Sequence, residues 1–169
     1  MTPTRAAACT VSPLTPQDIP IVSRLAHCIW PVCYADILTA EQIANMLERI
    51  YSEENLRKEM AEGHRFWAAY ESDAPVGFAS AYKENEIVWL KKLYVLPDRQ
   101  GRGIGKVLMD AAVAAFLPAQ ELRLLVHRHN LSAQRFYTRA GFARIGEAPV
   151  QMGDFHFVDL VFSKRLSRR

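Results

Sequence analysis

The sequence predicts an α/β fold in which a mixed sheet carries helices on both faces. Two short, aromatic-rich runs flank a turn signal at residues 73–75, which is typical of a β-hairpin. A strand-like run, a glycine-rich turn, a helical stripe and a second apolar strand then follow between residues 86 and 126. That order indicates a crossover connection between parallel strands. Two more strand-like runs close the chain, and together these patterns favour a mixed α/β sheet.

Helices are predicted in the first part of the chain over residues 15–29, 39–50 and 52–63. Apolar residues recur at helical spacing in the first of them, and Pro31 is expected to end it. Thr39 and Gln42 have the spacing of a capping box for the second helix. Ser52 is expected to cap the third helix.

Strands are predicted over residues 65–71, 76–82, 86–96, 122–126, 142–148 and 156–164. The run Leu122–Val126 is continuously apolar, so we expect a strand that is buried on both faces. One helix is expected from the glycine-rich turn to about Phe116. Another is expected to begin at Ser132 and to end at Gly141 in a left-handed C-cap.

Length and charge limit the classes of protein to consider. The 169 residues fit one domain, expected over residues 11–166, with residues 1–10 and 167–169 as flexible ends. The net charge is +3, and four basic residues lie in the last six positions, so the rest of the chain is nearly neutral. This charge distribution argues against a nucleic-acid partner.

Cysteine and histidine patterns point away from disulfides and metals. Three cysteines without paired spacing do not form a disulfide framework or a metal site, and a reducing cytoplasm is the expected compartment. His127, His129 and His156 lack the spacing of a metal-binding set and are interpreted as structural residues. The chain contains no apolar run of membrane-spanning length, so no membrane partner is expected.

The most informative segment is the glycine-rich turn QGRGIG, Gln100–Gly105. Glycine allows the main chain to approach a ligand closely, and the first N–H groups of a helix have no partner within the helix. These groups lie at the positive end of the helix dipole, so they hold a phosphate well. The segment therefore predicts a site for a phosphorylated cofactor.

Spacing excludes two common phosphate-binding sites. A P-loop requires four residues between its first glycine and Gly-Lys, followed by Ser or Thr. Here three residues separate Gly101 from Gly105-Lys106, and Val107 follows. A dinucleotide site requires glycine at position 106 and an acid at the end of the next strand, whereas Glu121 stands at the start of that strand.

Two segments resemble the GNAT superfamily of acyl-CoA-dependent N-acetyltransferases. LYVLPDRQGRGIGKVLM, residues 93–109, is similar to the family's pyrophosphate-binding segment. Asn130–Tyr137, followed by Gly141–Phe142, matches the signature Asn-x-x-Ala-x-x-Phe-Tyr…Gly-Phe. The resemblance extends from about Val11 to Leu166 and implies a mostly antiparallel central sheet. The segment QMGDFHFVDLVF, residues 151–162, is also similar to the bacterial polyamine-acetylating branch.

The resemblance implies acetyl-CoA as co-substrate, without a metal. The pantetheine arm is expected to pair with the strand at residues 93–95, and the pyrophosphate to bind N–H groups of the turn. Asn130 either binds pantetheine amides or caps a helix, and Ser132 is alternatively an N-cap. The implied coenzyme-binding residues are Leu93, Tyr94, Val95, Gln100, Gly101, Arg102, Gly103, Ile104, Gly105, Lys106, Asn130, Ser132 and Tyr137.

The resemblance also implies how protons move during transfer. Tyr137 matches the tyrosine that protonates the leaving sulfur in the family, although it also lies on an apolar helix stripe and could be a core residue. An alkylamine has a pKa near 10.4, so its deprotonation at pH 7 costs roughly 4–5 kcal/mol. A base is needed, and Glu86, acting through a water, is the candidate. Its alternative role is that of a solvated turn residue beside Glu84.

An acceptor pocket is expected where the first helix ends. Trp30, Tyr34 and Asp36 combine aromatic rings with an acid, a combination that suits a cationic amine. The two aromatic residues could equally be core residues that anchor the helix turn.

The predicted function is acetyl transfer from acetyl-CoA to a primary amine by direct attack in a ternary complex. The acceptor class includes small amines, polyamines and peptide or protein amines. Since no obvious base is present, a catalytically silent CoA-binding sensor or interaction module of the same fold is the alternative. Relatives are often dimers, so a homodimer is an open alternative to a monomer.

Overall fold

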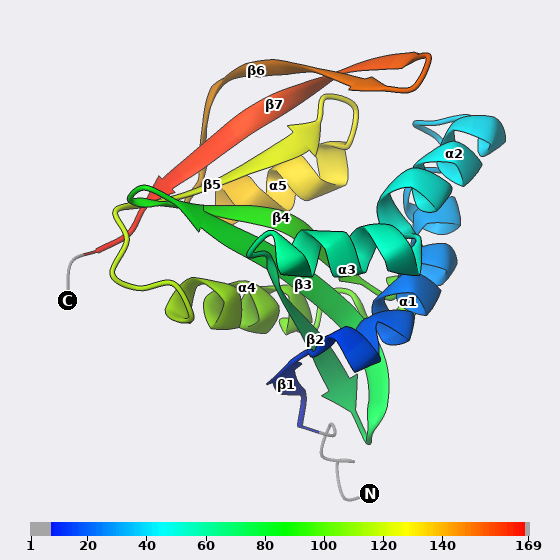
Figure 1. Ribbon diagram of the computed structural model, residues 1–169. Coiled ribbons are helices and arrows are strands. Elements are labelled where there is room, and N and C mark those ends of the chain that lie inside the picture. The colour runs from blue at the N-terminus through cyan, green and yellow to red at the C-terminus, as the bar shows by residue number, and fades with distance from the viewer. Residues whose placement is uncertain (1–7, 168–169) are drawn as a thin grey trace, which may run out of the picture.

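A seven-stranded sheet, in the order β1-β2-β3-β4-β5-β7-β6, organises the computed structural model, which describes residues 8–167 (Figure 1). Among the described strands, β4 and β5 pair in parallel and all other neighbours pair antiparallel. The predicted mixed, mostly antiparallel fold is confirmed. The strands are β1 (Thr10–Pro13), β2 (Arg65–Glu71), β3 (Ala74–Glu84), β4 (Ile87–Val95), β5 (Glu121–His127), β6 (Ala143–Met152) and β7 (Phe155–Arg165).

Helices cover both faces of this sheet, as expected. One apolar core lies between the sheet and α1–α3, and a second lies between the sheet and α4–α5. Phe78 and Ala79 are neighbours on β3 and belong to different cores, because successive side chains of a strand point to opposite faces. The helices are α1 (Ile19–Cys33), α2 (Ala40–Tyr51), α3 (Glu53–Ala61), α4 (Ile104–Ala114) and α5 (Leu131–Arg139), with short 3₁₀ turns η1 (Pro16–Asp18) and η2 (Pro97–Arg99).

The predicted helix caps of α2 and α3 are confirmed. The Gln42 backbone N–H donates to Thr39 Oγ1 at 3.1 Å, and Gln42 Oε1 accepts from the Thr39 N–H at 2.9 Å. Ser52 Oγ accepts from the Asn55 N–H at 3.2 Å. Such caps depend on residues three positions apart, which is why they are visible in the sequence.

Pro31 does not end the first helix, contrary to the prediction. It lies inside α1, which continues to Cys33, and the Tyr34 N–H still donates to the Trp30 carbonyl at 3.0 Å. A proline removes one backbone donor and strains the preceding turn. Ile29 and Trp30, the two residues before Pro31, are buried, so the packing of the last turns offsets this defect.

The first hairpin turns one step earlier than predicted. Ser72 and Asp73 both have positive φ, 48° and 65°, and Ala74 and Pro75 already belong to β3. Two successive residues of positive φ form the two-residue turn that suits the twist of a β-hairpin. The sequence cue from Asp73 to Pro75 therefore marked the hairpin but not its tip.

The first strand was not predicted. Residues up to about Val11 were expected to be a loose end, but Thr10–Pro13 pairs with β2 as an edge strand. Four residues are too few to show a period, so pairing with β2 defines this strand. The remainder of the predicted flexible ends, residues 1–7 and 168–169, lies outside the described residues.

β5 is not buried on both faces. Leu125 is 42% exposed, whereas Leu124 and Val126 beside it are buried. One face of this strand packs on a core, and the other faces an opening described below.

None of the helices within residues 8–167 has the length and hydropathy needed to span a bilayer.

Candidate active site

The central feature of the site is the divergence of β4 from β5. The two strands pair over four positions, from Ile87 with Glu121 to Leu90 with Leu124. Lys91 then forms a bulge, since Leu90 and Lys92 pair with consecutive residues of β3. Beyond it, β4 continues to Val95 beside β3, and β5 continues to His127 beside β7. A bulge bends its strand and increases the local twist, so the two strands separate here.

A chamber of about 350 Å³ occupies this divergence. Its walls come from β4 and β5, from the first two helices, from α5 and from the β6–β7 hairpin. The tip of that hairpin reaches α2, because a Cβ on Gly153 would lie 2.7 Å from an Arg49 nitrogen (Figure 1). The hairpin therefore closes one side of the chamber.

The glycine-rich turn has the backbone geometry expected of an anion site. Gly101 and Gly103 have φ of 78° and 82°, which L side chains rarely adopt. α4 begins directly afterwards, and its first internal bond runs from the Val107 N–H to the Gly103 carbonyl at 3.1 Å. The three preceding N–H groups therefore have no acceptor within the helix. Gly105 has a different role, since a Cβ there would lie 3.3 Å from the Phe136 ring of α5.

The charged side chains of the turn are already engaged. Arg102 and Arg99 lie 3.4 and 3.3 Å from the Glu71 carboxylate. Lys106 pairs with Asp110 at 2.8 Å along the exposed face of α4. Binding of a polyanion to the turn would therefore rely first on backbone N–H groups, with these side chains released from their present partners.

The coenzyme residues predicted on β4 divide between the two faces of the strand. Leu93 and Tyr94 both line the chamber, but Leu93 packs against the core on the α4 side and Tyr94 against the core on the α1–α3 side. Val95 packs against the core beneath α4. Its carbonyl accepts from Gln100 Nε2 at 3.2 Å, so a coenzyme that used this oxygen would share it with Gln100.

At the start of α5, the cap is Asn130 and not Ser132. Asn130 is buried and its side-chain oxygen accepts from the Ala133 N–H at 3.2 Å. Ser132 lies inside the helix and is exposed, so its alternative role as N-cap is excluded. Asn130 also lines the chamber, which keeps it beside the predicted coenzyme arm.

Tyr137 is a wall residue of the chamber and is only 8% exposed. Its ring packs edge-on against Phe136 and Phe142, which fixes its orientation. Burial raises its pKa, and the nearby Tyr34 and Cys33 raise it further. The phenol therefore stays protonated at neutral pH and is able to donate a proton or a hydrogen bond.

Trp30 and Tyr34 are core residues that also line the chamber. Their ring centroids lie 4.4 Å apart, and the Tyr34 hydroxyl is 2.9 Å from the Tyr94 hydroxyl. Burial is the main cause of a raised pKa for Tyr34, and the Asp159 carboxylate adds to it by repelling the phenolate. These rings give the chamber an apolar wall with hydroxyl groups on it.

Asp159 is a chamber residue that the sequence analysis missed. It lies on β7 opposite His127 of β5, and burial raises the pKa of its carboxyl, while Lys91 lowers it. The available signal was an acid on a strand where Phe157 and Val161, two positions away on either side, are apolar. His127 has a pKa lowered by burial and by the charges of His129 and Arg128, so it is neutral near pH 7.

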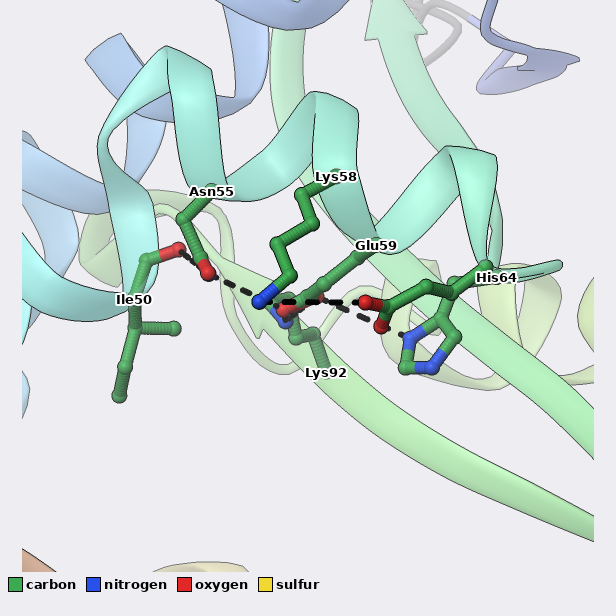
Figure 2. Close-up of polar contacts among 7 residues, drawn as sticks. Ile50, Asn55, Lys58, Glu59, His64 and Lys92 are labelled. Carbon is green, nitrogen blue, oxygen red and sulfur yellow. Dashed lines mark hydrogen bonds and ion pairs between the residues drawn. The ribbon is translucent and has the colours of Figure 1, made fainter.

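Beneath the chamber lies a buried ion pair (Figure 2). Lys92 Nζ contacts both Glu59 oxygens, at 2.7 and 2.6 Å, and Figure 2 shows Glu59 between Lys92 and His64. Burial lowers the pKa of Lys92 to about 8, against the opposing effect of Glu59. His64 stacks on Tyr82, a chamber residue, with ring centroids 4.5 Å apart. The pair thus ties α3 to β4 directly below the bulge.

The two predicted acids, Glu86 as base and Asp36 in the acceptor pocket, are not brought to the chamber. Glu86 is exposed, precedes β4 at the end opposite Val95, and its carbonyl accepts from the Gln120 N–H. Asp36 is exposed in the turn after α1 and does not line the chamber. Within residues 8–167, no group of three or more His, Cys, Asp or Glu side chains is arranged to hold a metal ion.

Comparison with known proteins agrees with this geometry. Spermidine N(1)-acetyltransferase from Thermoplasma acidophilum is 28% identical over 76% of this chain and 84% of its own length. Peptidyl-lysine N-acetyltransferase YjaB from Escherichia coli is 31% identical over 68% of this chain and 69% of its own.

A solved structure and a family match extend the comparison. The crystal structure of PaiA N-acetyltransferase from T. acidophilum, in complex with coenzyme A, superimposes with a TM-score of 0.81 at 25% identity and covers 94% of this chain and 99% of that one. The family described as acetyltransferase (GNAT) domain matches residues 34–163. The diverging strands, the glycine turn before α4 and this match together show that the chain belongs to the GNAT family of N-acetyltransferases.

Proposed function

We propose that the protein transfers the acetyl group of acetyl-CoA to a primary amine by direct attack in a ternary complex. The observation that carries this proposal is the chamber at the divergence of β4 and β5, which holds a buried phenol, Tyr137, and a half-buried carboxylate, Asp159. The phenol is suited to protonate the departing thiolate, and the carboxylate is suited to bind the arriving ammonium. Direct transfer requires both substrates to meet in one such space.

The coenzyme would lie along the unpaired edge of β4 and end on the glycine turn. Residues 92–95 pair with β3 on one side and have no partner among the described strands on the β5 side, so a pantetheine amide chain would add like a strand. The pyrophosphate would bind the N–H groups at the start of α4. The related PaiA structure is a complex with coenzyme A, which supports a coenzyme of this kind as the ligand.

In the reaction, the amine nitrogen attacks the thioester carbon, a C–N bond forms and the C–S bond breaks. Tyr137 would donate its proton to the sulfur as it leaves, which is consistent with its buried, protonated phenol. The products are an N-acetylated amine and coenzyme A, and the proton lost by the ammonium ends in solvent.

Asp159 is proposed as the group that holds the ammonium and accepts its proton, directly or through water. It replaces Glu86 in this role because it lines the chamber and Glu86 does not. Burial raises the pKa of the Asp159 carboxyl, which brings it closer to the operating pH of a general base. Relatives that act on spermidine or on peptidyl-lysine both use primary amines, in agreement with this chemistry.

The test is incubation of the purified protein with acetyl-CoA and a panel of small amines, polyamines, amino acids and peptides, read by mass spectrometry. The expected result is an acetylated product together with stoichiometric release of free coenzyme A thiol. If calorimetry shows acetyl-CoA binding but no member of the panel is acetylated, the proposal fails. The protein would then be a CoA-binding module of the same fold.

A further inference from the structure

A second cavity, of about 710 Å³, opens beside the chamber. We call it the outer groove. It lies between the turn after α1, the end of β5 and the β6–β7 hairpin. The groove and the chamber share four lining residues, Leu38, His127, Val150 and Phe157. An acceptor that enters the chamber from this side would therefore lie with its far end in the outer groove.

The outer groove is lined by basic side chains. Arg128 follows β5, and His127, His129 and His156 contribute imidazole rings, whereas none of the residues that line the groove is acidic. Arg128 is exposed and forms no ion pair with another described residue. Its backbone N–H donates to the Val158 carbonyl at 3.2 Å, which fixes its position beside β7.

The chamber, unlike the outer groove, contains a carboxylate. Asp159 is the only acid among the described residues that line it, and Lys91 and Lys92 are also in its wall. Lys92 is neutralised by Glu59, and Lys91 is close enough to lower the pKa of Asp159. The chamber therefore offers an ammonium group one carboxylate, Asp159, which Lys91 partly offsets.

This distribution suits an acceptor with one positive and one negative end. A polyamine would place its second ammonium near Arg128 without an acid to pair with it, and like charges brought together weaken binding. A carboxylate at the same place would pair with Arg128, which presents donors in the geometry that carboxylates accept.

We propose that the natural acceptor is a primary amine that also carries a carboxylate, such as an amino acid or the acidic end of a peptide. Its ammonium would meet Asp159 and its carboxylate would meet Arg128. His127 and Asp159 are direct partners across β5 and β7, and Arg128 follows His127 directly after the end of β5. His127 lines both cavities, so it lies between the chamber that holds Asp159 and the groove that holds Arg128. This arrangement suits an acceptor that carries its two charges at opposite ends of one short chain. This inference rests on the proposed function and specifies its substrate class.

The experiment compares three four-carbon amines that differ at the far end only: 4-aminobutyrate, butylamine and putrescine. A pair of C-terminally amidated peptides that begin Ala-Glu and Ala-Lys forms a second arm, which separates a free amino acid from a peptide as the source of the carboxylate. In at least one of the two sets, the acceptor with the carboxylate (4-aminobutyrate or the Ala-Glu peptide) is expected to have a kcat/KM at least about tenfold higher than the other members of its set. The difference should shrink at high ionic strength because salt screens exposed charges.

Arg128→Glu is the decisive variant, and Arg24→Ala, at an exposed arginine of α1 outside both cavities, is its control. Arg128→Glu should abolish or reverse the preference for the acidic acceptor and leave the KM for acetyl-CoA unchanged. The control should keep the preference.

Binding of the same acceptors to the protein loaded with coenzyme A, measured by calorimetry, makes the outcome independent of turnover. Selective binding of the acidic members, without product, would support the inference and count against the proposed function alone. Equal or tighter binding and faster acetylation of butylamine, putrescine or the Ala-Lys peptide would overturn the inference. So would a preference that Arg128→Glu leaves intact.

Discussion

The proposed coenzyme side and the proposed acceptor side of the active site are built in different ways. On the coenzyme side, consecutive residues from Leu93 to Lys106 provide a strand edge, a turn and a helix start, and the groups that would bind are mainly backbone N–H. On the acceptor side, the chamber is made of side chains from the first two helices, α5, two central strands and the β6–β7 hairpin. The first depends on local conformation, and the second depends on long-range packing.

This difference indicates which properties a substitution on each side should change. A change of backbone preference in the turn alters one local conformation, so apart from the cost of its own backbone strain it should affect coenzyme binding and not acceptor use. A change in the chamber wall removes a contact between distant elements, so it should reach stability, acceptor use or both. The predictions below test this contrast in order of decreasing effect.

The largest effect is expected from Lys92→Met. This change leaves Glu59 buried without its cation, and breaking a buried pair in this way typically lowers the free energy of unfolding by about 3–5 kcal/mol. Urea denaturation would measure it. Lys58→Met removes an exposed pair with Glu62 and should change stability by less than about 0.5 kcal/mol.

The double variant Lys92→Met with Glu59→Leu removes both charges of the pair. Its stability should recover much of the loss, since the unpaired charge is gone. A double variant less stable than Lys92→Met would show instead that Glu59 is held by other contacts, such as His64.

Tyr137→Phe is expected to lower kcat by about 100-fold or more, because a proton donor in the transition state typically contributes that much. Affinity for coenzyme A should stay within about twofold, since the ring and its packing remain. Steady-state kinetics and calorimetry would measure the two quantities. Tyr70→Phe, on β2 and outside the chamber, is the control. An unchanged kcat would assign Tyr137 to the core alone.

Gly103→Ala tests the coenzyme side against Gly63→Ala. Both glycines have positive φ, 82° and 101°, and both have open space where a Cβ would stand. Each substitution should therefore lower stability by about 1–2 kcal/mol. Only Gly103→Ala should weaken coenzyme A binding, by about tenfold in calorimetry, because its strain lies at the first N–H groups of α4. Equal affinities would remove the turn from the coenzyme site.

The smallest effect concerns pH and Asp159. Its folded-state pKa lies above the unfolded value, so the native protein binds more protons between the two values. This carboxyl therefore lowers stability as pH rises from about 4 through its folded-state pKa. Asp159→Asn should lack that decline, with a difference below about 1 kcal/mol because the group is partly exposed to solvent.

Urea unfolding between pH 4 and pH 7 would measure this difference, with Asp154→Asn at an exposed carboxyl as the control. Asp159→Asn should also lower kcat/KM for the acceptor, while the KM for acetyl-CoA stays the same. A variant with unaltered acceptor kinetics would exclude Asp159 from amine binding.

Features set by neighbouring residues were predictable from the sequence. The capping box of Thr39 and Gln42 and the cap at Ser52 each involve residues three positions apart. The turn before α4 was also predictable, because positive φ at Gly101 and Gly103 is a local requirement. The end of α1 was not, since the burial of Ile29 and Trp30 overrides the break expected at Pro31.

The candidate site divides along the same line. Residues 93–106 and 130–137 each form a continuous sequence motif. These two motifs were sufficient to indicate the family and the order of the elements from the sequence alone. Only the tertiary structure decided which side chains line the chamber. Asp159 meets His127 because β7 inserts between β5 and β6, and Glu86 is left outside because it lies at the far end of β4. Strand order and register act over long distances in the chain, so no local pattern records them.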